Sequence, residues 1–186
     1  MKSLTFVNIV VRLAIVALLL PVSLLAAQNP DSSAVSEALE QVKSHAAKAD
    51  LDAHTLVSYT RSGVGWRNHG DQLTLIKKHV NDLIEDGNRL STMRDEASPW
   101  QQDAIDRITS LLPEMSSQLS ATIDHLNDNQ NRTHMKAFRD LVRTNETIIH
   151  NAHEIISDYV DYGEAKAKAD ALAKELQLPA VPETAS

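Results

Sequence analysis

Residues 35–56 have the sequence VSEALEQVKSHAAKADLDAHTL, in which apolar and small residues recur at alternating steps of four and three. This spacing places those residues on one face of an α-helix, because 3.6 residues complete a turn. Such a stripe is typical of a helix that packs lengthwise against other helices. Its members are Val35, Leu39, Val42, Ala46, Ala49, Ala53 and Leu56.

Three further stripes with the same period follow, over residues 73–90, 105–126 and 135–159. The last stripe is the widest, because Leu141 and two isoleucines lie beside it. No segment shows the alternation that is typical of strands. The predicted helices cover residues 32–61, 68–96, 99–127 and 132–162. Since short loops make successive helices antiparallel neighbours, the predicted fold is an all-α, up-down-up-down four-helix bundle.

The breaks between the stripes support the same number of helices. Gly63, Gly65 and Gly70 are three of only five glycines in the chain, and they predict a connector between the first two helices. Residues 98–101, Ser-Pro-Trp-Gln, form a capping box with proline at the first helical position, which predicts a helix start. Residues 127–131, Asn-Asp-Asn-Gln-Asn, predict the last loop, because these side chains compete for backbone hydrogen bonds.

The two ends of the chain differ from the bundle region, which we expect to cover residues 28–163. Residues 164–177 are rich in strong helix formers but contain little apolar bulk, so we predict a helical arm that extends past the bundle. Residues 178–186 are predicted to be a disordered tail.

The first 27 residues have the composition of an export signal. Lys2 and Arg12 accompany an apolar run over residues 13–20, and small residues at 26–27 precede a polar stretch. We therefore expect a periplasmic or secreted protein whose signal peptide is cleaved near residue 27. The alternative is an uncleaved anchor, but Arg12 and Pro21 interrupt the apolar stretch, so no stable membrane span is expected after cleavage.

Charge and composition exclude several classes of function. The first 27 residues hold two of the 18 basic residues and none of the 25 acidic ones, which leaves a formal charge of −9. Nucleic acids and anionic membranes are poor partners for such a protein, because both require clustered Lys and Arg. The chain has no cysteine, which excludes disulfides, covalent c-type haem, thiolate zinc sites and iron–sulfur clusters.

Three of the eight histidines are predicted to lie at one height in the bundle. His69 opens the second predicted helix, His125 lies near the end of the third, and His134 lies near the start of the fourth. The glycine-rich connector with Trp66 is expected to cap the same end. This layer, Trp66 with the three histidines, is our candidate binding site. It could hold zinc, copper or a haem iron, or the histidines could simply cap helix ends and bond loop carbonyls.

His150 and His153 form a second histidine pair, three residues apart and therefore on one helix face. Two ligands are too few for a closed metal site, and both positions lie off the fourth stripe. We interpret them as solvent-exposed, and we predict no metal ligand, cofactor or catalytic residue.

Three stretches of this sequence resemble uncharacterised exported helical proteins of bacteria. They are YTRSGVGWRNHG at residues 59–70, ASPWQQ at residues 97–102 and YVDYG at residues 159–163. The resemblance spans most of the chain beyond the export signal, and it implies that signal and a helical fold but no activity.

The sequence favours a non-enzymatic, exported bundle that acts through contacts with a protein partner or with a second copy of itself. Strong helical periodicity, an acidic surface and the lack of a catalytic motif support this hypothesis. The alternative is a metal- or haem-binding bundle that uses the histidine layer at one end.

Overall fold

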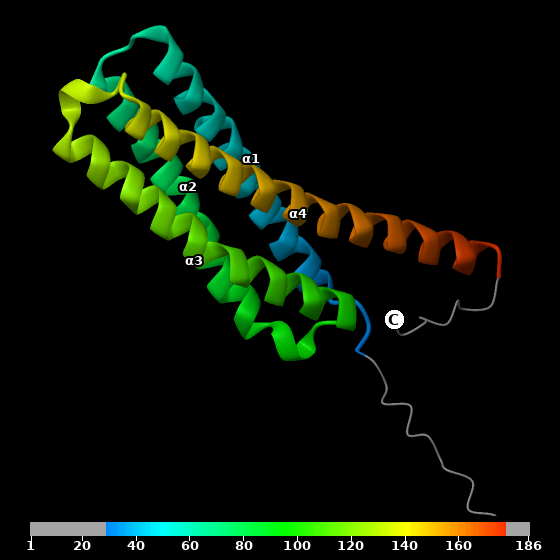
Figure 1. Ribbon diagram of the computed structural model, residues 1–186. Coiled ribbons are helices and arrows are strands. Elements are labelled where there is room, and N and C mark those ends of the chain that lie inside the picture. The colour runs from blue at the N-terminus through cyan, green and yellow to red at the C-terminus, as the bar shows by residue number, and fades with distance from the viewer. Residues whose placement is uncertain (1–28, 178–186) are drawn as a thin grey trace, which may run out of the picture.

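The computed structural model describes residues 29–177, so the predicted export signal and the predicted disordered tail lie outside the described residues. Within this range the chain is almost entirely helical (Figure 1). The elements are α1 (Ser33–Ser62), α2 (Trp66–Thr92), the short 3₁₀ turn η1 (Arg94–Glu96), α3 (Pro99–Asp128), the 3₁₀ turn η2 (Gln130–Arg132) and α4 (Lys136–Glu175). No helix in this range is both long enough and apolar enough to cross a membrane.

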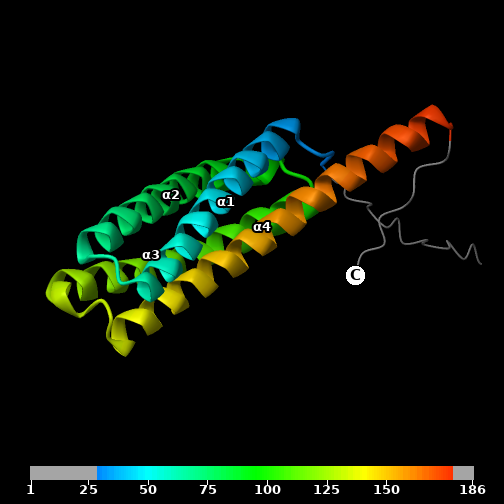
Figure 2. The same ribbon diagram turned by 90° about the horizontal axis from the view of Figure 1, so that it is seen from above.

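The four long helices form the predicted up-down-up-down bundle. Helix α1 packs against α2 and α4, and α3 closes the opposite side by packing against the same two helices. Figures 1 and 2 show the antiparallel order and the two connections that lie together at one end, after α1 and after α3. The all-α four-helix fold is confirmed.

The stripe at residues 35–56 forms part of the core. Each of its seven members is at most 1% exposed, because all seven point toward α2, α3 or α4. Ala46, Ala49 and Ala53 are therefore buried inside the bundle, where their small side chains allow close helix approach.

Several helix boundaries differ from the prediction. Gly70 lies inside α2, so the first connector is only residues 63–65, with Gly63 in the left-handed region at φ 69°. Helix α2 ends at Thr92, four residues early, because the chain tightens into η1 before Pro99. Helix α4 begins only at Lys136, after η2, so Met135 is the exposed N-cap and not a core residue.

Helix α4 continues through Gly163 without a break and extends beyond the other three helices as an arm (Figures 1 and 2). A Cβ at Gly163 would lie 2.6 Å from Cη2 and 3.2 Å from Cζ2 of Trp100. Glycine is therefore required here for packing, since it lets the indole ring lie directly against the backbone of α4.

We expect Gly163→Ala to lower the free energy of unfolding by about 1–3 kcal/mol, because the rigid indole ring cannot yield without moving off α4. Gly70→Ala is the matched control, since its Cβ would meet only Leu126 Cδ2 at 3.8 Å. That change should raise stability by roughly 0.5–1 kcal/mol, as replacing glycine inside a helix usually does. Urea denaturation of both variants tests this contrast, and equal shifts in the two variants would contradict the packing at Trp100.

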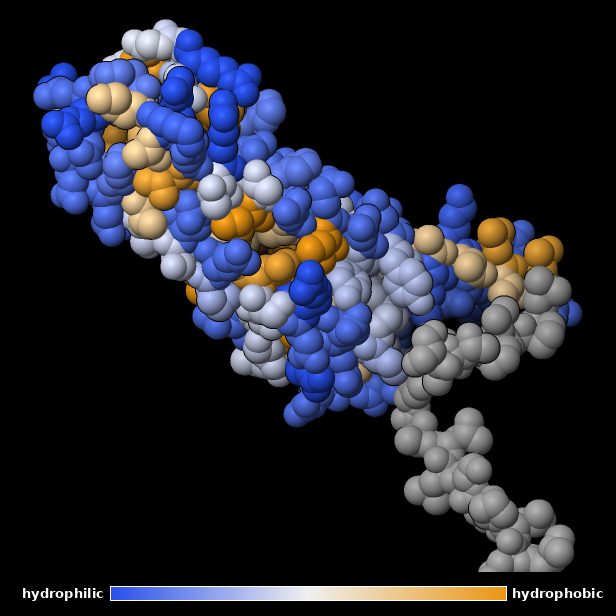
Figure 3. All heavy atoms as spheres, in the orientation of Figure 1, coloured by the Kyte–Doolittle hydropathy of each residue, from blue (hydrophilic) through white to orange (hydrophobic). Residues whose placement is uncertain are grey.

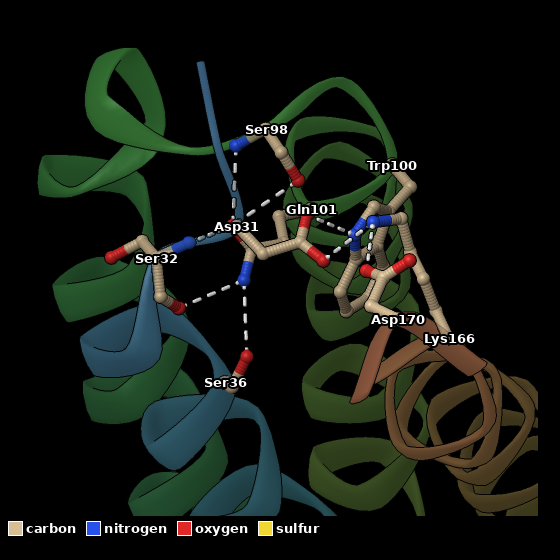
Figure 4. A network of polar contacts seen from close by, with 8 residues as sticks. All are labelled: Asp31, Ser32, Ser36, Ser98, Trp100, Gln101, Lys166 and Asp170. Carbon is tan, nitrogen blue, oxygen red and sulfur yellow. Dashed lines mark hydrogen bonds and ion pairs between the residues drawn. The ribbon is translucent and has the colours of Figure 1, made fainter. Parts of the chain in front are cut away.

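The predicted capping box is present and belongs to a larger polar network (Figure 4). Gln101 is fully buried, and its Oε1 accepts hydrogen bonds from the backbone N–H groups of Ser98 (3.1 Å) and Ser32 (2.9 Å). Its Nε2 donates to the Ser32 carbonyl (2.9 Å) and to Ser36 Oγ (3.1 Å). One amide side chain thus joins the start of α3 to the start of α1.

The same network reaches the arm of α4 through Asp31. Trp100 Nε1 donates to Asp31 Oδ1 at 2.7 Å, and Lys166 Nζ lies 3.1 Å from Asp31 Oδ2 (Figure 4). Burial raises the pKa of Asp31, but hydrogen bonds with Ser98, Lys166 and Trp100 outweigh it and lower the pKa overall. The charged form of Asp31 therefore ties α1, α3 and α4 together at this end.

Candidate functional site

The predicted histidine layer lies at the end of the bundle where α2 begins and α3 ends. His69 is buried at 1% exposure in the second turn of α2, and its Nδ1 lies 3.1 Å from the Gly65 carbonyl oxygen. Burial lowers the pKa of His69, although the Gly65 hydrogen bond opposes this. The ring is therefore neutral and donates from Nδ1, which leaves Nε2 buried without a hydrogen-bond partner within residues 29–177.

Phe138 brings two of the predicted residues together. Its ring centroid lies 5.4 Å from that of His69, in an edge-to-face contact, and 6.1 Å from that of His125, in a stacked contact. His134 is exposed, and Trp66 is half-buried against the core with the Arg67 guanidinium 5.2 Å from its ring. Three of the four residues thus pack at this end of the core, and His134 faces solvent.

The three histidines do not converge as ligands of one ion. In the part of the chain that the structure describes, one group of three ligand-type side chains has its donor atoms within 4.8 Å of one another, and it contains none of these histidines. The aromatic contacts of Phe138, a member of the fourth stripe, account for the positions of His69 and His125. The layer therefore has the geometry of a packed bundle end.

A different feature, the α3–α4 groove, offers an open binding surface. Its first part is a hollow of about 440 Å³ lined by Trp100, Asp103, Ile155, Asp158, Tyr159 and Tyr162. Its second part is a hollow of about 410 Å³ lined by Arg107, Leu111, Glu114, Ile148, Asn151, Ala152, Glu154 and Ile155. Ile155 lines both parts, so the two hollows adjoin at this residue along the two helices. Figure 3 shows apolar side chains gathered around a hollow on this face.

Aromatic residues shape the end of the groove nearest the arm. Tyr162 is 50% exposed and meets Trp100 edge-on, with ring centroids 5.4 Å apart. Tyr159 donates from its hydroxyl to Asp103 Oδ2 at 2.5 Å. Burial, together with the hydrogen bond and the charge of Asp103, raises the pKa of Tyr159 to about 12. The tyrosine stays protonated at neutral pH and holds α4 against α3.

The sequence signal for this groove is the pair of isoleucines that lie beside the fourth stripe. Ile148, Ile155 and Tyr162 recur every seven residues on α4, beside the stripe that enters the core. On a helix this spacing makes a second row on nearly the same face, next to the core positions. The core of four helices does not need this second row to fill it. The row therefore remains partly exposed in the groove.

The rim of the groove is mostly acidic. Four carboxylates line it, against the single guanidinium of Arg107. They are Asp103, Glu114, Glu154 and Asp158. An apolar floor with an acidic rim is suited to binding the apolar face of a basic amphipathic segment.

The opposite flank, between α1 and α2, is covered by paired polar side chains. His45 Nδ1 lies 2.8 Å from Asp86 Oδ2, and Arg89 Nη2 lies 3.2 Å from Asp86 Oδ1. Gln72 Nε2 donates to Asp52 Oδ1 at 2.9 Å. These contacts pair most of the polar groups named here with one another, and the hollow on this flank is lined by polar and charged side chains. The more apolar α3–α4 groove is therefore the better candidate for a partner surface.

Comparison of the chain with protein-family models, with curated proteins and with solved structures finds no match.

Proposed function

We propose that this chain is a non-enzymatic interaction module of the cell envelope that binds an amphipathic helix of a partner protein in the α3–α4 groove. The single observation that carries the proposal is the pair of adjoining hollows that share Ile155, the first of which is lined mainly by apolar surface. Residues 1–27 support a location outside the cytoplasm, because they have the composition of an export signal. Fractionation of cells that produce the full chain tests that location, and recovery in the cytoplasm alone would contradict it.

The length of the groove suits a helix. The lining residues of α4 run from Ile148 to Tyr162, a span of about 21 Å at roughly 1.5 Å per residue. This is the length of about four helical turns, which is typical of helix-in-groove recognition. Aromatic side chains at one end add anchoring area, since tyrosine and tryptophan are enriched in binding surfaces.

The charge of the groove favours a basic partner over a second copy of this chain. The whole chain has a formal net charge of −7, and the groove rim carries four carboxylates. Two copies that met at this face would bring acidic rims together, and like charges oppose association. A segment with Lys or Arg beside an apolar face would gain both apolar burial and favourable charge pairing.

A model peptide tests the proposal directly. In a Trp66→Phe variant, Trp100 is the remaining tryptophan and reports on the groove. A peptide of about 18 residues, with Leu on one helical face and Lys on the other, should shift the Trp100 emission with a Kd in the micromolar range. A peptide with Glu in place of Lys should not bind, because its charge matches that of the rim.

Two substitutions that leave the net charge unchanged distinguish binding in the groove from general electrostatic attraction to an acidic protein. Ile155→Ser should weaken the Leu/Lys peptide about tenfold, because one buried isoleucine is worth roughly 1.5–3 kcal/mol. Leu75→Ser removes an exposed leucine (46% exposed) from α2 and should leave the Kd unchanged. Equal affinity for the parent and both variants would show that the peptide follows net charge only, and the proposal would then be abandoned.

A further inference from the structure

The flank between α1 and α4 contains a cluster of three metal-binding side chains, Asp50, His150 and His153. The two histidines are three residues apart on α4 and therefore share a face. His150 Nδ1 lies 3.3 Å from both carboxylate oxygens of Asp50, and His153 Nδ1 lies 3.3 Å from Asp50 Oδ2. Donor atoms of all three residues lie within 4.8 Å of one another. The sequence alone offered two ligands, and the fold adds a third from a helix 100 residues away.

The distances in this cluster lie between those of other histidine–aspartate pairs in the described residues, which are 3.6 Å for His79–Asp52 and shorter for His45–Asp86. His45 Nδ1 and Asp86 Oδ2 are 2.8 Å apart, the usual length of a hydrogen bond to a carboxylate. At the cluster both separations are 3.3 Å. Zinc bonds to histidine nitrogen and to carboxylate oxygen measure roughly 2.0–2.1 Å, so neighbouring donors around a tetrahedral zinc ion are about 3.3 Å apart. A spacing of 3.3 Å therefore fits two donors of one zinc ion as well as it fits a hydrogen bond.

The surroundings of the cluster also favour a cation. Glu146 and Glu154 both act electrostatically on His150, and each adds negative potential. The side chains of Asp50 and His153 are 21% and 22% exposed, whereas that of His150 is 51% exposed. An ion can therefore enter from solvent. The buried residues Ala49 and Ala152 lie next to these ligands in the sequence, so the ligands project from helix segments that the core holds in place.

We propose that Asp50, His150 and His153 form a three-ligand site for a divalent transition-metal ion, with Zn²⁺ as the best-matched occupant. Imidazole with a single carboxylate suits zinc, whereas Mg²⁺ and Ca²⁺ prefer sites made of oxygen ligands. Three protein ligands leave a fourth position open for water or for a donor from another molecule. The bound ion joins α1 to α4. This site is independent of the α3–α4 groove and of the function proposed for it.

Zinc titration of the chelator-treated protein tests the site. Isothermal titration calorimetry should find one high-affinity Zn²⁺ per chain, and Mg²⁺ at the same concentration should give no heat. Because the ion binds the folded state, a free zinc concentration a hundredfold above Kd should raise Tm by roughly 5–10 °C. Crystals grown with zinc should show an anomalous difference peak between α1 and α4.

Four substitutions locate the ion among the eight histidines of the chain. Asp50→Asn, His150→Gln and His153→Gln should each weaken zinc binding at least about tenfold, since even the loss of an outer-shell partner commonly costs that much. His134→Gln is the control, because His134 is exposed and belonged to the layer predicted from the sequence. It should bind zinc like the parent protein. Circular dichroism of each variant confirms that the helices are intact.

Three outcomes would overturn the site. The first is a parent protein that binds no zinc, and the second is an unchanged affinity in any one of the three ligand variants. The third is loss of binding in His134→Gln, which would place the ion at the bundle end instead. In that last case the Tm of the three ligand variants would still rise with zinc.

Discussion

Phe138→Ala lowers the free energy of unfolding by about 3–5 kcal/mol, the largest loss we expect from a single change in this protein. Phe138 is 1% exposed, and it contacts the rings of both His69 and His125. Its removal leaves a cavity at the end of the bundle and exposes one side of the buried His69 ring. The cavity adds to the loss of transfer free energy, because the surrounding helices relax only in part.

Urea denaturation followed by circular dichroism measures this loss. Phe138→Leu is the control, since it keeps most of the volume and should cost less than about 1.5 kcal/mol. A loss below about 1 kcal/mol for Phe138→Ala would show that this end of the bundle is not packed as described here.

Gln101→Leu should have the second-largest effect and should lower the free energy of unfolding by about 3 kcal/mol. Leucine fills a similar volume but cannot accept from the N–H groups of Ser32 and Ser98, which both depend on Gln101 Oε1. The N–H of Ser98 is buried, and losing its partner costs about 1–3 kcal/mol. The N–H of the half-buried Ser32 adds a smaller part of the effect.

Gln102→Leu provides the comparison for this second change. Gln102 is only half-buried and makes one side-chain hydrogen bond, from Nε2 to the Ala97 carbonyl at 2.9 Å. Because water can replace that partner, we expect Gln102→Leu to lower the free energy of unfolding by less than about 1 kcal/mol. Similar chemical-denaturation midpoints for the two variants would contradict the role of Gln101 as the link between α1 and α3.

The fold was predictable because its signals are local. A period of four and three over residues 35–56 places one stripe in the core, and the capping box at residues 98–101 marks the start of α3. The boundaries at Thr92 and Lys136 were less predictable. A 3₁₀ turn lies close to each of these boundaries, after α2 and before α4, and the difference between the two hydrogen-bond patterns leaves little trace in side-chain periodicity.

The candidate sites depend on information that no single helix contains. The positions of the loops determine how far along the bundle each residue lies. On this basis His69 and His125 are expected at the same end, and both contact Phe138 there. His134 lies before α4, in the loop between η2 and Lys136, and it is exposed there. The rotation of each helix about its axis decides which helical side chains meet. Rotation also brings Asp50 of α1 to His150 of α4, a juxtaposition that sequence spacing could not reveal.

Because α4 is longer than the other helices, its last turn and the segment before α1 differ as places to attach a label or a tether. From Val160, the last buried residue of α4, to Glu175 the helix is about 22 Å long, so a label attached in the last turn of α4 lies away from the core of the bundle. At the amino end, Asn29 is hydrogen-bonded to the Asp95 carbonyl and Asp31 to the Trp100 indole. A tether placed there emerges beside the aromatic mouth of the α3–α4 groove and would compete with whatever enters it.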